Sequence, residues 1–353
     1  MKLFNTSLTR RLVGALALGL GMGWHVAQAQ QAPQLPPGYK AEYKLSLVVG
    51  TAFPWGKGGE IWSNLVKERT NGRINIKLYP GVSLVGGDQT REFTAIRQGV
   101  IDMAIGSSIN WSPQVKELNL FSLPFLIKDY ASLDALTGGE VGKDVFSILD
   151  KAGVMPLAWG ENGFRELTNS KRDIASPADL KGLKIRVVGS PLFLEMFTAL
   201  GANPVQMSWA DAQPALSSGA IDGQENPVSI FTAAKLHTVG QKHVTMWGYM
   251  IDPLVFVVNK DVWNSWTPED REIVRKSAVD AGKQEIALAR AGLVEAGRPL
   301  LKDIEGLGVK ITTLNAAQRE QFVSATRSVY NKWKPQVGAP LVDKAEKALA
   351  TVK

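Results

Sequence analysis

Cysteine is absent from this chain of 353 residues, and histidine occurs only three times. Without thiols the chain has no disulfide, no thiolate metal site and no cysteine nucleophile, so its fold depends on the hydrophobic core. His237 and His243 are separated by five residues without a carboxylate cluster nearby, which favours two solvated side chains over a metal-binding pair. The G-x-S-x-G, H-E-x-x-H and P-loop motifs are also missing. These absences weigh against an enzyme, and we expect no cofactor.

Long apolar runs are missing as well, apart from one near the N-terminus. Basic residues precede the apolar run 12–24, and "VAQAQ" follows it with small residues at Ala27 and Ala29. This pattern predicts a secretory signal peptide over residues 1–29, cleaved after Ala29. The alternative, a membrane anchor, is disfavoured because the run is shorter than the roughly 20 residues that span a bilayer. We therefore expect export to the periplasm, with the proline-rich residues 30–40 as a flexible leader.

Charge of neither sign is concentrated in one place. The chain has 40 basic and 33 acidic residues, for a formal net charge of +7, without a cluster of Lys and Arg. Nucleic acid is therefore not an expected partner. A small anionic ligand remains compatible with this balance.

Strands and helices alternate along the first part of the chain. The pattern predicts strands at 43–50, 74–81 and 101–107, with helices at 59–72 and 90–100. Crossovers of helical length predict parallel strands covered by helices. Because ligands bind at the carboxyl ends of such strands, the loops at 51–59 and 106–111 are candidate binding loops.

The same alternation begins again after residue 154. Two similar α/β units predict a two-lobed fold with a cleft between the lobes. The strand at 252–263 is expected to return to the first lobe. Thr267 is a helix N-cap, and the helix that follows can run about thirty residues, enough to span both lobes. The predicted boundaries are 41–162 plus 252–290 for lobe I and 163–251 plus 291–353 for lobe II.

Arg186 interrupts the apolar strand "LKIRVV" and cannot lose its charge to suit burial, so it needs an anion. That anion is either an acidic side chain of the core or a ligand, and the strand alone does not separate these alternatives. Arg165 and Asn226 also stand out, since Asn226 precedes a proline that places its amide at the end of a strand. An arginine fork beside an amide donor suits a carboxylate.

Several long blocks carry a family resemblance, among them "NGFRELTNSKRDIASPADLKGLKIRV", "GANPVQMSWADAQPALSSGAIDGQENP" and "LYPGVSLVGGDQTREFTAIRQGVIDMAIG". In their order and spacing the chain resembles the DctP-type substrate-binding proteins of tripartite ATP-independent periplasmic (TRAP) transporters. The resemblance implies that Arg186 clamps the carboxylate of an organic acid, that Arg165 assists and that Asn226 makes a further contact. It also implies a two-lobed α/β fold like that of periplasmic binding proteins, with strands that cross between the lobes, closure of the lobes on the ligand, and a membrane permease as partner. We expect the protein to be a monomer.

The remaining candidate residues lie around the same cleft. Phe53 and Trp55 stand in "TAFPWGKGG", where sugar-acid binders of the family tend to place polar groups, and Ser107 ends the third strand. Trp209 and Trp247 are further candidates, although large aromatic side chains are equally compatible with core packing. This aromatic-rich mouth favours a monocarboxylate with an apolar or aromatic body, such as a 2-oxo or 2-hydroxy acid.

Three other interpretations stay open. A C4-dicarboxylate would be the ligand if Arg91 or Lys57 met a second carboxylate. Asp252, a candidate ligand contact, and Glu225 are possible bases if the chain is instead a secreted hydrolase or lyase of α/β build. The soluble ligand-binding subunit of a sensor would use the same site. Whether a metal ion bridges ligand and protein is not decided by the sequence.

Overall fold

The computed structural model describes residues 35–352. The predicted signal peptide, its cleavage site and the first part of the predicted leader lie outside the described residues. In the remainder of the leader, the Tyr39 hydroxyl donates to Asp270 at 2.7 Å and the Lys40 ammonium pairs with Asp102 at 2.5 Å. Within the described part of the chain, no helix has the length and apolar character needed to cross a membrane.

Five strands form the first sheet, in the order β2-β1-β3-β10-β4. The predicted parallel pairing is confirmed, because β1 pairs in parallel with both β2 and β3. The returning strand is confirmed too, since β10 lies antiparallel between β3 and β4. The strands of this sheet are β1 (Tyr43–Ser46), β2 (Ile76–Tyr79), β3 (Met103–Ser107), β4 (Val154–Phe164) and β10 (Ile251–Asn259).

Six strands form the second sheet, in the order β11-β9-β5-β8-β6-β7. β6 pairs in parallel with β7 and β8, β9 pairs in parallel with β11, and β5 runs antiparallel to β8 and β9. The strands of this sheet are β5 (Glu166–Asn169), β6 (Lys184–Val187), β7 (Asn203–Gln206), β8 (Gly223–Asn226), β9 (His243–Met246) and β11 (Lys310–Thr313).

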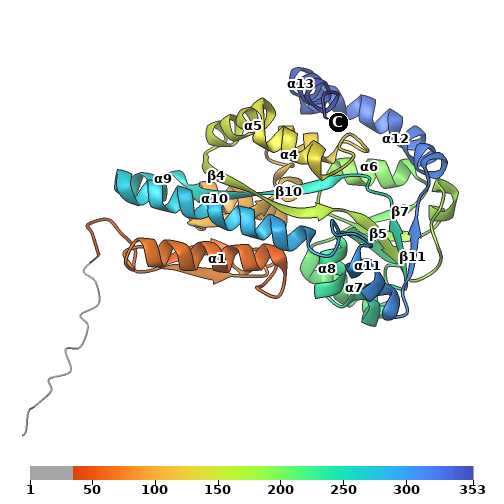
Figure 1. Ribbon diagram of the computed structural model, residues 1–353, viewed down its shortest axis with the longest axis horizontal. Coiled ribbons are helices and arrows are strands. Elements are labelled where there is room, and N and C mark those ends of the chain that lie inside the picture. The colour runs from red at the N-terminus through yellow and green to blue at the C-terminus, as the bar shows by residue number, and fades with distance from the viewer. Residues whose placement is uncertain (1–34, 353) are drawn as a thin grey trace, which may run out of the picture. The chain divides into compact units, whose positions relative to one another are not determined.

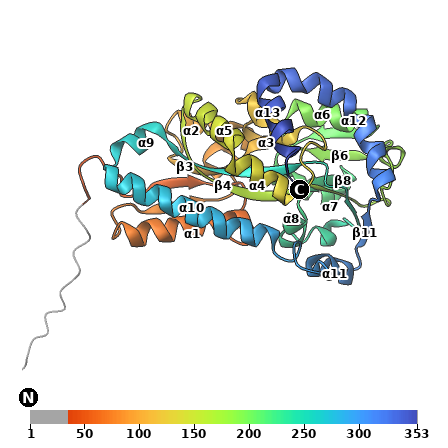
Figure 2. The same cartoon turned by 45° about the horizontal axis from the view of Figure 1, so that its top comes forward.

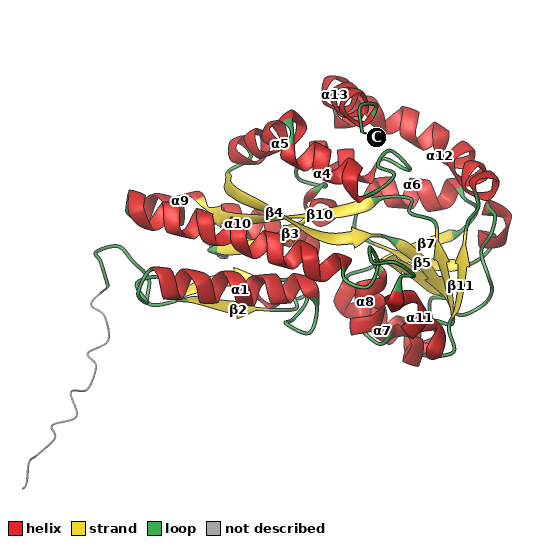
Figure 3. Ribbon diagram, in the orientation of Figure 1, coloured by secondary structure: helices red, strands yellow, loops and turns green. Residues whose placement is uncertain are grey.

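Helices cover the sheets, as Figures 1 and 3 show. The α-helices are α1 (Pro54–Arg69), α2 (Glu92–Arg97), α3 (Ser108–Trp111), α4 (Tyr130–Gly138), α5 (Glu140–Lys151), α6 (Pro191–Ala199), α7 (Trp209–Ser218), α8 (Val228–Ala233), α9 (Lys260–Ser265), α10 (Pro268–Arg290), α11 (Pro299–Gly306), α12 (Ala316–Val337) and α13 (Ala339–Leu349). Short 3₁₀ helices are η1 (Ser83–Val85), η2 (Gln89–Arg91), η3 (Lys116–Ser122), η4 (Pro177–Leu180) and η5 (Leu236–Val239).

Strand β10 is apolar over its central residues 253–258 because both faces of the first sheet are covered. Successive side chains of a strand point to opposite faces. Leu254 and Phe256 accordingly pack into a core with α1 and α10, whereas Val255 and Val257 pack into a second core with α2 and α5. A third core, formed with α7, α8 and α11, covers one face of the second sheet.

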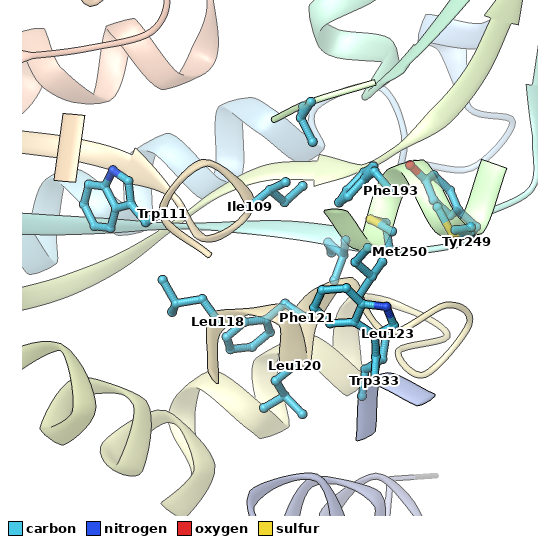
Figure 4. Packing of buried hydrophobic residues seen from close by; sticks show 14 of the residues in the cluster. Ile109, Trp111, Leu118, Leu120, Phe121, Leu123, Phe193, Tyr249, Met250 and Trp333 are labelled. Carbon is cyan, nitrogen blue, oxygen red and sulfur yellow. The ribbon is translucent and has the colours of Figure 1, made fainter. Parts of the chain in front are cut away.

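The second of these cores is continuous between the two sheets. Figure 4 shows part of it, where Phe121 of η3, Phe193 of α6 and Trp333 of α12 lie among the packed side chains. Helices α12 and α13 contribute to this layer, with α12 packed against α6 and η3 and α13 packed against α4 and α5. Figure 2 shows these two helices beside α6 and α4. The C-terminal helices therefore contact elements of both predicted lobes, and the lobe boundaries stay a prediction.

Two segments cross from one sheet to the other, as the sequence predicts. Strand β4 ends at Phe164 in the first sheet and β5 begins at Glu166 in the second, with Arg165 as the single residue between them. The second crossing joins β9 to β10, and its Met250 carbonyl accepts the Arg165 backbone N–H at 3.0 Å. The two crossings therefore lie side by side.

The long helix is shorter than predicted. Thr267 caps α10 by accepting the Asp270 N–H at 3.2 Å, but the helix ends at Arg290 instead of continuing toward residue 299. Gly292 has a φ of +74°, a left-handed conformation that suits glycine and turns the chain away from the helix. Helix α10 packs along α1 and β4 of the first sheet, and α11 and β11 then bring the chain to the second.

Candidate functional site: a cleft between the two sheets

A cleft lies between the sheets, at the strand ends where the sequence predicts ligand binding. It contains about 330 Å³ of empty space, counted up to its open mouth. Trp55 comes from the first predicted binding loop, and Ser107 and Asn110 come from the second. The opposite side is formed by residues at the ends of β6 and β8, including Arg186 and Asn226.

Seven of the nine predicted site residues line this cleft. They are Arg165, Arg186, Asn226, Trp209, Trp55, Ser107 and Asp252. Phe53 does not line it: this residue precedes α1 and packs at the edge of the core beneath that helix. Trp247 does not line it either. The centroid of its ring lies 4.3 Å from that of Tyr249 and 5.5 Å from that of Phe322, on the far side of the crossing strands.

Arg165 is neutralised by the protein itself. Its guanidinium makes a bidentate contact with the Glu225 carboxylate, and Nη2 also donates to the Glu225 carbonyl at 2.7 Å. The Tyr249 hydroxyl donates to the same carboxylate at 2.5 Å. Only Nη1 is free of Glu225, and its contact with Asp252 is long at 3.5 Å. This geometry fixes the plane of the guanidinium and leaves one nitrogen for a ligand.

Arg186 has no such partner. Its side chain is 1% exposed, Nε donates to the Met207 carbonyl at 3.0 Å, and the guanidinium lies 5.9 Å from the Trp209 ring. No carboxylate lies within ion-pair distance of it among residues 35–352, and Nη2 has no hydrogen-bond partner there. A buried unpaired charge is unfavourable, so the fold holds a cation ready for an anion that it does not itself supply.

The pKa values of the two arginines reflect this difference in pairing. Burial lowers the pKa of Arg186 to about 10, and the charge of Glu225 only partly opposes this effect. Burial alone would also lower the pKa of Arg165, but the adjacent Glu225 reverses the effect and the pKa is raised. The lowering at Arg186 corresponds to roughly 3 kcal/mol of unfavourable free energy for its charged form, which nonetheless persists at neutral pH.

Polar side chains on the other walls of the cleft form hydrogen bonds with one another. Asp252 accepts hydrogen bonds from Ser107 at 2.7 Å and from Asn162 at 2.9 Å, and burial raises its pKa, an effect that the Arg165 charge partly offsets. The Asn162 Oδ1 atom is left without a partner among the described residues. Asn226 donates to Gln224 at 2.5 Å and lines the cleft.

Gln89 connects the two sides of the cleft. Its Nε2 donates to Asn110 at 2.6 Å, and its Oε1 accepts the Trp209 backbone N–H at 3.0 Å. Sequence reasoning missed Gln89, Asn110 and Asn162 as lining residues. Gln89 and Asn162 stand in blocks that carry the family resemblance, and Asn110 lies in a predicted binding loop, but a single sequence does not distinguish them from ordinary loop amides.

The groups required by the other interpretations are arranged unfavourably. Arg91 and Lys57 do not line the cleft, and Lys57 pairs with its helix neighbour Glu60. Glu225 is occupied by Arg165. His243 is bonded to Asp173 at 2.7 Å. Among the described residues, no group of three or more His, Asp or Glu side chains is placed to hold a metal ion.

Comparisons with known proteins agree with this architecture. Residues 45–336 match the DctP model, described as bacterial extracellular solute-binding protein, family 7. The chain belongs to this family of two-lobed solute-binding proteins.

Individual members are similar over most of their length. A TRAP periplasmic solute-binding protein from Ralstonia eutropha H16, solved with bound (S)-2-acetolactate, is 73% identical, covers 88% of this chain and 99% of its own, and superposes with a TM-score of 0.88. The 2,3-diketo-L-gulonate-binding periplasmic protein of Escherichia coli K12 is 34% identical over 69% of this chain and 76% of its own. The C4-dicarboxylate-binding periplasmic protein of Vibrio cholerae is 30% identical over 86% of this chain and 89% of its own.

Proposed function

We propose that this protein captures a small monocarboxylate in the cleft and delivers it to a TRAP membrane permease. The observation that carries the proposal is Arg186, a buried guanidinium with no anion of the described chain beside it. A ligand carboxylate would take two oxygens to the guanidinium fork and would offset the cost of the buried charge. Water exclusion from the small cleft strengthens that ion pair.

The neighbouring donors complete the carboxylate site. Asn226 and Arg165 both line the cleft, and their N–H groups suit the remaining carboxylate lone pairs. Because Glu225 already neutralises Arg165, the second arginine acts as an oriented donor more than as a second charge. The expected net charge of the bound acid is therefore −1.

The body of the acid is expected to be short and oxygenated. The orphaned Asn162 Oδ1 suits a ligand hydroxyl, and Gln89 and Asn110 line the same side, whereas Val188 and Ile230 offer apolar contacts. A branched 2-hydroxy or 2-oxo acid fits both features. The acetolactate bound by the Ralstonia eutropha protein has a hydroxyl and a methyl group on the carbon next to its carboxylate, and that protein is 73% identical to this chain.

A C4-dicarboxylate is the second candidate, since the Vibrio cholerae relative is named for such ligands. Its second carboxylate would need a further unpaired cation in the cleft. Arg165 is already paired, and neither Arg91 nor Lys57 lines the cleft. The geometry therefore favours the monocarboxylate.

The remaining parts of the proposal follow from family membership and the N-terminal sequence. The chain acts as a receptor and not as an enzyme, a role that family membership supports, and the carboxylates of Glu225 and Asp252 are already engaged by Arg165, Tyr249, Ser107 and Asn162. It is exported to the periplasm with cleavage after Ala29, and it works as a monomer. No nucleic acid is involved.

Calorimetric titration tests the ligand and the clamp together. We expect (S)-acetolactate and its stable analogue 2-hydroxy-2-methylbutanoate to bind more tightly than succinate. Arg186→Lys should weaken binding of both monocarboxylates by more than a hundredfold, because an ammonium does not reproduce the bidentate fork. The matched control is Arg327→Lys, an exposed arginine on α12, which should bind like the unmodified protein.

The outcomes separate the alternatives. Tighter binding of succinate would replace the monocarboxylate with the dicarboxylate candidate, and unchanged affinity in Arg186→Lys would refute the clamp. Incubation of 2-hydroxy-2-methylbutanoate with the pure protein, followed by NMR, tests the enzymatic alternative. Recovery of the unchanged acid is expected, and turnover would overturn the receptor proposal.

A further inference from the structure

A second cavity lies behind the crossing strands, outside the carboxylate cleft. It contains about 930 Å³ of empty space, compared with about 330 Å³ in the cleft. Both crossings line it, through Phe164 and Glu166 at one and Met246 to Gly248 at the other. The two cavities share none of their lining residues.

The two cavities nevertheless meet at one short segment. Successive residues of an extended chain point to opposite sides, so Arg165 lines the cleft while Glu166 lines the second cavity. Trp247, on the wall of the second cavity, donates its indole N–H to the Arg165 carbonyl at 3.1 Å. An occupant of the second cavity would therefore touch the backbone that positions the cleft.

Three cations line this cavity without an acidic partner. Lys128, Arg298 and Arg319 come from three separate segments, and none has an ion-pair or side-chain hydrogen-bond partner among residues 35–352. Arg319 is half-buried, with its guanidinium 4.9 Å from the Phe125 ring, and burial lowers its pKa. Convergent unpaired cations around a concave surface attract anions.

The two carboxylates in the same cavity are already engaged. Asp129 caps α4 by accepting the Ser132 N–H at 2.8 Å. Glu166 accepts the backbone N–H groups of Trp247 at 2.7 Å and Gly248 at 3.0 Å, and burial raises its pKa to about 7. The three cations therefore outnumber the two carboxylates that line the cavity.

The rest of the lining is largely apolar and aromatic. Tyr130 and Phe164 pack edge to face at 5.1 Å, Trp247 lies on the wall, and Val228 and Leu293 add aliphatic surface. A concave apolar wall with a few converging charged groups is the usual make-up of a site for a small organic molecule. The cations at the rim favour a ligand with an anionic group, and the apolar wall favours a ligand whose remaining part is apolar.

We propose that this cavity is a second binding site, taking a small organic anion with an aromatic body, such as an arylacetate. Its carboxylate lies among Arg319, Arg298 and Lys128, and its ring packs against the partly exposed Tyr130 and Phe164. The site shares none of its lining residues with the cleft that contains Arg186. Because its walls include both crossing segments, occupancy of one site and affinity at the other are linked, and each changes the other by the same factor.

Fluorine NMR with 4-fluorophenylacetate as probe tests the site in the full chain. The Arg186→Ala variant removes competing binding in the cleft, and we expect it to retain saturable probe binding. Arg319→Ala should weaken that binding at least tenfold. Leu293→Trp, which fills the cavity without changing its charge, should do the same. The matched control is Arg327→Ala, an exposed arginine two turns further along α12 that does not line the cavity.

Every outcome bears on the proposal. Probe binding that survives in Arg186→Ala and Arg327→Ala but weakens in Arg319→Ala and Leu293→Trp supports it. Absence of saturable binding overturns it, and so does binding lost in Arg186→Ala, which would assign the probe to the cleft. Titration of 2-hydroxy-2-methylbutanoate into Arg319→Ala checks the fold, because an intact cleft should still bind that acid.

Discussion

Arg165 and Arg186 lie on the wall of the same cleft and are almost equally buried, at 2% and 1% exposure, but their surroundings differ completely. Arg165 makes a bidentate pair with Glu225 and a longer contact with Asp252. Arg186 contacts a carbonyl oxygen and an aromatic ring, and its Nη2 has no hydrogen-bond partner among residues 35–352. The charge of Arg165 is neutralised by an acidic side chain of the protein, whereas that of Arg186 has no such partner among the described residues.

The difference supports the proposal that Arg186, and not Arg165, supplies the charge that meets the ligand. Desolvation acts on both guanidinium groups, and only a nearby anion reverses its effect on the pKa. A protein selected for stability alone would pair or remove a cation such as Arg186. Retaining it at a cost of roughly 3 kcal/mol makes sense if the ligand brings the missing charge. Substitutions at Arg165 and at Arg186 test this difference separately.

The largest expected effect is on stability, at Arg165. Arg165→Met leaves the buried Glu225 carboxylate with the Tyr249 hydroxyl but without its cation, and breaking a buried pair from one side typically costs about 3–5 kcal/mol. Urea unfolding of the ligand-free protein measures the loss. Arg69→Met removes an exposed pair with Asp280 and should cost less than about 1 kcal/mol.

A second substitution sharpens the test. Adding Glu225→Gln to Arg165→Met removes the stranded charge and keeps an acceptor for Tyr249, so most of the lost stability should return. If the double variant is no more stable than Arg165→Met, the loss comes from packing and not from the unpaired carboxylate.

At Arg186 the expected effect on stability has the opposite sign. Arg186→Met removes the unfavourable buried charge, worth roughly 3 kcal/mol, and loses the hydrogen bond to Met207, worth about 1 kcal/mol. The ligand-free variant should therefore be about 2 kcal/mol more stable by urea unfolding. Destabilisation instead would mean that the guanidinium is neutralised within the protein, and the contrast with Arg165 would fail.

The sequence predicts the fold well because the relevant signals are local. Strand alternation and helical stripes fix β1 to β3 and their parallel pairing, and the apolar strand at 252–263 predicts the return to the first sheet. The end of α10 is missed, because its helical pattern continues past Arg290 and the turn depends on the conformation of Gly292. The signal peptide stays a prediction.

The site is predicted less completely, because pairing is a property of the folded chain. Arg165 and Arg186 are both visible in the sequence, but the side chain that neutralises one of them is Glu225, sixty residues beyond Arg165 and on a neighbouring strand. Aromatic side chains are ambiguous for the same reason. Trp55 and Trp247 look alike in sequence, and only three-dimensional packing separates a cleft wall from the core behind it. The ligand contacts themselves stay a prediction.

The smallest expected effect concerns how closely the two sides of the cleft approach. Gly189 follows β6, and a Cβ added there would lie 2.4 Å from the Thr90 methyl carbon on the opposite side. Relieving such an overlap costs roughly 1–3 kcal/mol, so Gly189→Ala should weaken binding of 2-hydroxy-2-methylbutanoate about tenfold or more in calorimetry. Gly138→Ala, where a Cβ meets nothing within 4 Å, is the matched control.

Thr90→Ser provides the rescue, because serine lacks the methyl group that the added Cβ would meet and keeps the hydroxyl that bonds to Asp88. The double variant Gly189→Ala with Thr90→Ser should recover most of the lost affinity. Failure to recover would place the effect in the backbone at Gly189 and not in the approach of the two sides. Recovery would indicate that Arg186 holds its ligand only while these two sides remain in contact.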